Sequence, residues 1–236
     1  DGGYLIDKIL DTAGQKGTGK WSVINAMELG MPLGLIATAV FERSLSAQKD
    51  LRVEASGTFK ARPSEVAYNR PELVNDIYAA LYASKLVSYA QGFAVLQQAS
   101  DNFGWNLDLA SIARLWRGGC IIRSAFLNDI AAAFETSEKS VHLLLAPYFK
   151  QEIDQLLSGW KHLVSYAMKN ELPVPAFSSA LNYFYSLISP QLPANMLQAQ
   201  RDYFGAHTFE RVDQSRGTFF HENWTGHGGT TKSGTY

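Results

Sequence analysis

The chain has 236 residues with 21 basic and 22 acidic side chains, so its formal net charge of −1 creates no overall attraction to nucleic acid or anionic membranes. Its hydrophobic content of 46% is ample for a folded core, and its single cysteine excludes an internal disulfide. No apolar run approaches the ~20 residues of a membrane span and no signal peptide is recognisable, so we expect a cytoplasmic protein without membrane or nucleic-acid partners.

The first distinctive element is the stretch Asp11-Thr-Ala-Gly-Gln-Lys-Gly-Thr-Gly-Lys-Trp21, which places three glycines and two lysines between two helix-like segments. Glycines allow backbone N–H groups to approach a ligand, the following helix start adds partial positive charge, and the lysines add full charge. Lys16 and Thr18 could therefore hold the oxygens of a phosphate or a sugar acid, although a solvated turn could have the same composition. The case for Lys20 as a ligand-binding residue is weaker.

The segment from Gly14 to Lys20 also fits the nucleotide-binding pattern G-x-x-x-x-G-K. That pattern requires Ser or Thr after the lysine to bind Mg²⁺, whereas Trp21 follows the lysine here. A nucleotide P-loop also follows a buried strand, but the apolar residues upstream recur at helical spacing. We therefore interpret the loop as an anion site of another kind.

Apolar periodicity and the Gly and Pro breaks predict a mainly α fold of helices packed on helices, with no strand pattern of any length. Residues 71–98 carry two apolar faces, which predicts a central helix. In the helix over 33–45, Arg43 interrupts an apolar stripe, and this pattern alone favours a structural role for its long side chain. The expected helices span residues 21–29, 33–45, 71–98, 108–116, 121–134, 147–168, 176–188 and 194–203.

From about residue 208, glycines separated by Thr, Ser and His predict an extended tail that cannot fold alone. Phe219, Phe220 and Trp224 lie in this tail without an obvious partner in the chain, which favours docking on another surface over disorder. His221 and His227 could assist this docking. The histidine spacings match no metal-ligand pattern, so we expect no metal.

Several motifs together closely resemble the decarboxylating 6-phosphogluconate dehydrogenase family, and they span nearly the whole chain. Besides the glycine loop, they are Phe41-Glu-Arg43-Ser-Leu-Ser, Trp116-Arg-Gly-Gly-Cys-Ile-Ile-Arg123-Ser, Arg201-Asp-Tyr-Phe-Gly-Ala-His207-Thr-Phe-Glu and Asn223-Trp-Thr-Gly-His-Gly-Gly229. The resemblance implies the C-terminal helical region of an enzyme that converts 6-phosphogluconate to ribulose 5-phosphate with reduction of NADP, in the pentose phosphate pathway. It implies a substrate-binding and dimerisation domain over 1–207 and a tail over 208–236 that docks on the partner subunit.

The resemblance also implies the site residues. Lys16, Thr18 and Arg43 would bind 6-phosphogluconate, and Arg201 and His207 would bind its phosphate in the site of the neighbouring subunit of a homodimer. The cofactor NADP would touch Ser233, Gly234, Thr235 and Tyr236 across the dimer.

The general base, the general acid and the Rossmann domain of the family lie upstream of this segment, so we expect no catalytic residue in the chain and no activity from it alone. The alternative is a non-catalytic helical dimerisation module of the same fold.

Overall fold

A computed structural model describes residues 2–62, 68–136 and 142–227, and the regular secondary structure of these residues is almost entirely helical. The chain divides into two compact units, Asp1–Phe184 and Tyr185–Tyr236. The expected mainly α class is confirmed. No helix in the described part of the chain is both long and apolar enough to span a membrane.

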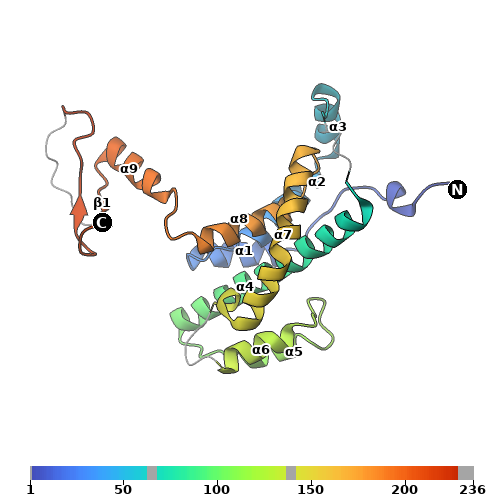
Figure 1. The fold of residues 1–236 in the computed structure, drawn as a ribbon, viewed down its shortest axis with the longest axis horizontal. Helices are drawn as coiled ribbons and strands as arrows, with labels where there is room; N and C mark the ends of the chain where they lie inside the picture. Colours follow the sequence, from blue (N-terminus) through green and yellow to red (C-terminus); the bar gives the residue numbers. More distant parts are fainter. Residues whose placement is uncertain (1, 63–67, 137–141, 228–236) are drawn as a thin grey trace. The chain divides into compact units, whose positions relative to one another are not determined.

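The helices of the first unit run from a short 3-10 turn near the N-terminus to α8, which crosses into the second unit (Figure 1). Their bounds are η1 Leu5–Lys8, α1 Thr18–Glu28, α2 Gly34–Ser46, α3 Lys49–Thr58, α4 Arg70–Phe103, α5 Leu109–Leu115, α6 Leu127–Thr136, η2 Leu143–Leu145, α7 Pro147–Lys169 and α8 Pro175–Ile188. The second unit adds α9 Ala194–Gly205 and a two-stranded antiparallel hairpin of β1 Phe209–Glu210 and β2 Phe219–Phe220.

The core of the first unit is the packing of α7 across α4, which Figure 1 shows as two crossing helices. Small buried residues of α4, among them Ala79, Ala80 and Ala83, let α7 approach closely. Gly159 of α7 lies at this approach, because a Cβ there would stand 2.9 Å from the Cβ of Ala79. Trp160 beside it is fully buried and donates from Nε1 to the carbonyl of Phe177 at 3.2 Å.

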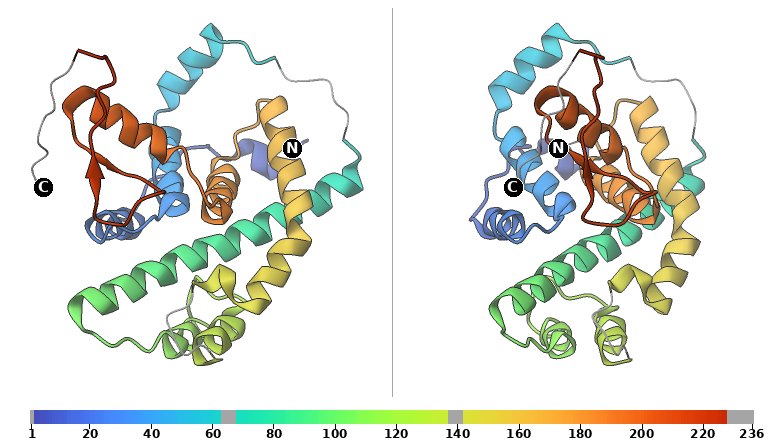
Figure 2. Two further views of the ribbon diagram at one scale, coloured as in Figure 1. Left: turned by 60° about the vertical axis from the view of Figure 1, so that its left-hand side comes forward. Right: turned by 90° about the vertical axis from the view of Figure 1, so that its left-hand side faces the viewer.

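The α5 and α6 helices cover another part of α4, as both views of Figure 2 show. The buried ring of Phe93 contacts the rings of Trp116 and Phe134 at centroid distances of 5.1 and 5.3 Å. Offset ring pairs at such distances add to the stabilisation from burial alone. The helical hairpin is therefore attached to α4 through aromatic side chains.

A smaller apolar cluster joins α1 to α2 and thereby places the glycine loop. Val23 and Ala26 of α1 are buried with Leu33, and Ile36 and Val40 of α2 pack against them. The pair is tied to the central helix by one polar contact, in which the backbone N–H of Leu35 donates to Gln91 Oε1 at 3.2 Å.

The structure differs from the sequence-based expectation between residues 117 and 126. We expected a helix from Ile121, whereas α6 begins at Leu127 and the preceding residues form turns. Gly119 has a left-handed φ of +67°, and the Tyr89 hydroxyl donates to the carbonyl of Ile122. That tertiary contact competes with helical hydrogen bonding, and a local pattern cannot reveal it. The helix α3 was also not expected, and the hairpin strands are too short to show a period of two.

The close approach of α7 to α4 makes Gly159→Ala destabilising. The new methyl group meets Ala79, which cannot rotate away, so we expect a loss of about 1–3 kcal/mol despite the better helix propensity of Ala. Gly92→Ala on α4 is the matched control, because a Cβ there has nothing within 4 Å and should add about 0.5–1 kcal/mol. Urea unfolding of both variants measures the effect. Equal shifts of the two midpoints would contradict the packing described here.

Candidate functional site

The glycine loop turns sharply into α1. Gly17 precedes the helix with φ +112°, a conformation that side-chain-bearing residues rarely adopt. Gly19 lies against α2, since a Cβ on it would stand 2.8 Å from Val40 Cγ2. These two glycines are therefore required by a left-handed turn and by a close helix contact.

The N-terminus of α1 is free to bind an anion. The first backbone bond of the helix runs from the N–H of Trp21 to the carbonyl of Gly17 at 2.9 Å, so the N–H groups of Thr18, Gly19 and Lys20 have no acceptor in the helix. No acidic residue lies in the first turn to neutralise its partial positive charge. Lys16, Thr18 and Lys20 are all exposed, and Lys16 forms no ion pair among the described residues.

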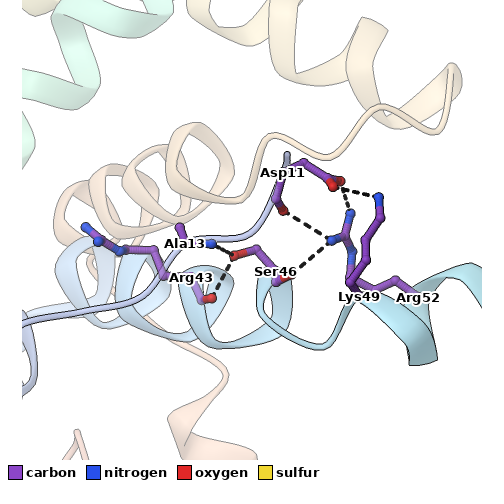
Figure 3. Close-up of polar contacts among 6 residues, drawn as sticks. All are labelled: Asp11, Ala13, Arg43, Ser46, Lys49 and Arg52. Carbon is purple, nitrogen blue, oxygen red and sulfur yellow. Dashed lines mark hydrogen bonds and ion pairs between the residues drawn. The ribbon is translucent and has the colours of Figure 1, made fainter. Parts of the chain in front are cut away.

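The segment that leads into the loop is bound to the end of α2 and the start of α3, as Figure 3 shows. The backbone N–H of Ala13 donates to Ser46 Oγ at 2.9 Å. Asp11 accepts from Lys49 Nζ at 2.6 Å and from the guanidinium of Arg52. These hydrogen bonds from Lys49 and Arg52 lower the pKa of Asp11 to about 2, so the carboxylate is charged at neutral pH.

Arg43 reaches the same loop from α2, where its Nη2 donates to the carbonyl of Gly14. The structure therefore brings Arg43 to the loop that carries Lys16 and Thr18. Sequence reasoning identified these three residues but missed the supporting set of Asp11, Ser46, Lys49 and Arg52. The acidic and basic residues among them lie 38 and 41 positions apart, and no short motif connects them.

In the second unit, Asp202 gathers the end of α9 and the tail around one buried carboxylate. Its side chain is 0% exposed. Burial acts to raise its pKa, but donors from Glu222, His221, Trp224 and Thr208 outweigh burial and lower the pKa to about 2. Oδ1 accepts from the N–H of Thr208 and from His221 Nδ1, each at 2.9 Å, and Oδ2 accepts from the N–H of Glu222 at 3.0 Å and from Trp224 Nε1 at 2.8 Å.

Arg201 and His207 stand on either side of this anchored turn. Arg201 is exposed near the end of α9, with a contact of 3.4 Å from Nη1 to Gln198 Oε1. The His207 ring lies against Gly205, where an added Cβ would stand 2.7 Å from its Nε2. Ala206 and Thr208 both have left-handed φ values, of +50° and +61°, so the turn has a defined and costly shape. Asp202 holds that shape.

Two of the three tail aromatics, Phe220 and Trp224, have partners within the chain, which corrects the expectation that they lack them. The Trp224 ring lies 6.2 Å from that of Phe209 and its indole N–H binds Asp202, while Arg211 lies over the Phe220 ring at 5.5 Å. Phe219 and Trp224 nevertheless keep exposed fractions of 56% and 45%. Part of the aromatic surface therefore remains available to another surface.

The expected cofactor contacts Ser233, Gly234, Thr235 and Tyr236 lie outside the described residues. Among the residues that the structure does describe, no group of three His, Cys, Asp or Glu side chains is arranged to hold a metal ion.

Comparisons with known proteins agree on one family. The sequence model of the family "6-phosphogluconate dehydrogenase, C-terminal domain" matches residues 1–224. The decarboxylating 6-phosphogluconate dehydrogenases of Treponema pallidum and Mus musculus are 52% and 48% identical over the whole of this chain, which covers 50% and 49% of their lengths. The chain thus spans about half the length of the curated relatives it matches.

A solved structure shows the same fold. The 6-phosphogluconate dehydrogenase of Plasmodium falciparum, described in its apo form and in complexes with NADP+ and with 6-phosphogluconate, superimposes with a TM-score of 0.88 at 42% identity. The match covers 94% of this chain and 47% of the other.

The buried carboxylate of Asp202 should control the turn that carries Arg201 and His207. In Asp202→Asn, an amide group replaces one oxygen and leaves two partly buried donors without their acceptor, at a cost of about 2 kcal/mol. We expect faster hydrogen exchange at the amides of Thr208 and Glu222. Asp213→Asn, which alters an exposed carboxylate paired with Arg211, is the control and should leave both amides unchanged.

The stability that Asp202 gives to this turn should decrease at acidic pH. The pKa of Asp202 in the folded protein is below its ordinary value of 3.8. The carboxylate therefore contributes its full stabilisation of the fold above about pH 4, and this stabilisation is lost as the pH falls toward 2. The measurement is hydrogen exchange at the Thr208 amide between about pH 4 and pH 2, in the wild-type chain and in Asp202→Asn. If the two chains exchange at the same rate throughout this range, Asp202 does not anchor the turn.

Proposed function

The chain belongs to the 6-phosphogluconate dehydrogenase family, and we propose that it forms the C-terminal part of an NADP-dependent enzyme that decarboxylates 6-phosphogluconate to ribulose 5-phosphate and CO2. The glycine loop carries this proposal, because it presents unpaired backbone donors, Lys16 and Arg43 in one anchored element. We place the reaction in the pentose phosphate pathway and in the cytoplasm.

We propose that the chain binds and orients the substrate. The guanidinium of Arg43 suits two-point contact with a carboxylate or phosphate, and Lys16 and the Thr18 hydroxyl add single donors beside the helix N-terminus. The oxidation requires a base for the C3 hydroxyl proton, a hydride acceptor and an acid for the enediol. By resemblance these groups are outside the 236 residues, so the role assigned to this chain is positioning. NADP would accept the hydride, with the tail residues Ser233 to Tyr236 contributing a minor contact.

We further propose that two copies share each site. Arg201 and His207 would bind the phosphate of the substrate held by the partner subunit, with the tail from residue 208 docked on that subunit. The exposed faces of Phe219 and Trp224 support this, since grouped aromatic rings at a surface favour contact with another protein. The alternative of a non-catalytic dimerisation module predicts a parent reading frame without a Rossmann domain, and sequencing upstream of this segment distinguishes the two.

The first test is substitution in the loop of the complete enzyme. Lys16→Ala and Arg43→Ala should each raise the KM for 6-phosphogluconate, because loss of a charge-assisted contact costs on the order of 1.5–3 kcal/mol, or roughly 10- to 150-fold. The affinity for NADP should hardly change. Lys20→Ala removes an equal charge from the same loop and should have a smaller effect. Normal substrate binding in both variants would show that the loop is structural.

The second test uses a mixed dimer of one Arg201→Ala subunit and one Lys16→Ala subunit, separated by different affinity tags. If sites are shared, both defects fall in one site and the other stays intact, so the mixed dimer keeps about half of the wild-type activity. If Arg201 serves its own subunit, each site has one defect. Activity no higher than the mean of the two parent variants would then be measured, and the shared-site proposal would be wrong.

A further inference from the structure

A second group of basic residues surrounds a cleft of about 640 Å³ in the first unit, apart from the glycine loop. Lys85 and Tyr82 come from α4, and Arg117, Arg123 and Ser124 come from the turns that precede α6, with Phe126 beside them. Clefts of this volume are in the range that binds small molecules. None of these residues belongs to the site described above.

The three cations of the cleft have no ion-pair partner in the part of the chain that the structure describes. No carboxylate lines the cleft, and none of the three forms an ion pair. The neighbouring Arg114, in contrast, is paired with Glu135. Because the chain as a whole has a net charge of −1, this cluster does not reflect a generally basic surface. Grouped cations repel one another, and an anion bound between them would relieve this repulsion.

Two carboxylates influence one wall of the cleft electrostatically. Burial raises the pKa of the Tyr82 hydroxyl, and the charges of Glu152 and Asp129 add to the rise. Neither of these acidic residues lines the cleft. The Tyr82 hydroxyl lies 3.1 Å from that of Tyr148, which holds its ring in place at the wall.

Aromatic side chains position Lys85 and the turn between the two arginines. Lys85 Nζ lies 5.6 Å from the centre of the Phe126 ring, a distance typical of a cation–π contact. Phe126 is 1% exposed and packs edge-on against Tyr89 at 5.0 Å. The Tyr89 hydroxyl in turn donates to the carbonyl of Ile122, which anchors the turn between the two arginines.

The turn is also what brings the two arginines to one cleft. Residues six positions apart on a continuous helix point about 120° away from each other around its axis. The break in helical structure between residues 117 and 126 instead places Arg117 and Arg123 at the same cleft. The departure from the expected helix therefore has a consequence for binding.

We propose that this cleft is a binding site for a small phosphate-bearing anion, separate from the substrate loop. Arg117, Arg123 and Lys85 supply the charge, and the guanidinium groups suit two-point contact with phosphate oxygens. The Ser124 hydroxyl is a further donor. The exposed ring of Tyr78, stacked on that of Tyr82 at 5.9 Å, forms an apolar wall that fits a flat, uncharged portion of the same ligand.

Inorganic pyrophosphate is the probe for this site, and amide chemical shifts of the 236-residue chain are the readout. We expect saturable shifts at residues 117–124. Arg117→Gln and Arg123→Gln should each weaken this binding by about 10-fold or more, because each removes a charge-assisted contact. Both side chains are exposed, so the variants should fold, and Lys85→Met is a further variant that keeps an unbranched apolar stem.

Two controls separate this site from general electrostatics and from the loop. Lys169→Gln removes one exposed charge that lies outside the cleft and forms no ion pair with the described residues, and it should leave the shifts unchanged. Lys16→Ala should also leave them unchanged, although it affects the loop. Absence of saturable shifts at residues 117–124, an equal loss in Lys169→Gln, or loss of the shifts in Lys16→Ala would each overturn the proposal. A cleft variant that alters only the oligomeric state would overturn it as well.

Discussion

The close packing of α7 across α4 is the constraint on which the first unit depends. A long helix that buries residues around much of its surface needs neighbours on several sides, and the Ala residues of α4 allow one of them to approach at Gly159. The helices α5 and α6 cover a further side of α4, where the rings of Trp116 and Phe134 contact Phe93. The α1–α2 pair is then tied to this framework through Gln91 and the N–H of Leu35, so the glycine loop inherits its position from the central helix.

Two carboxylates do comparable work in the two units. Asp11 binds Lys49 and Arg52 and so attaches the loop segment to the start of α3. Asp202 is fully buried and collects four donors from the tail, which shapes the turn beside Arg201. In both places an acidic residue with a lowered pKa holds a backbone segment in a defined conformation. A basic side chain nearby, Lys16 or Arg201, is exposed to solvent. Rigid support of this kind reduces the conformational entropy that a ligand would have to remove.

The basic residues that the structure describes fall into two groups, those paired with acids and those without such a partner. Several basic residues are paired with acids and serve the fold, as Arg114 is with Glu135. Lys16, Lys85, Arg117 and Arg123 have no such pairing among the described residues, and they occur at a helix N-terminus or around a cleft. A protein of almost zero net charge can thus present two local positive sites without a general affinity for polyanions.

The sequence by itself determined the helical class, most helix positions and the anion character of the glycine loop, because helical periodicity, glycine breaks and local charge are short-range properties. The charge of Arg43 in an apolar stripe is visible locally too, although that pattern alone favoured a structural role and the family resemblance was needed to assign it to the site. Only the tertiary structure decided what lies far apart in the chain: the contact of Asp11 with Lys49 and Arg52, and the collection of Thr208, His221 and Trp224 around Asp202. It likewise decided that residues 117–126 form turns, because Tyr89 captures the carbonyl of Ile122 from another helix. Such contacts depend on the path of the chain in space, and no local pattern encodes that path.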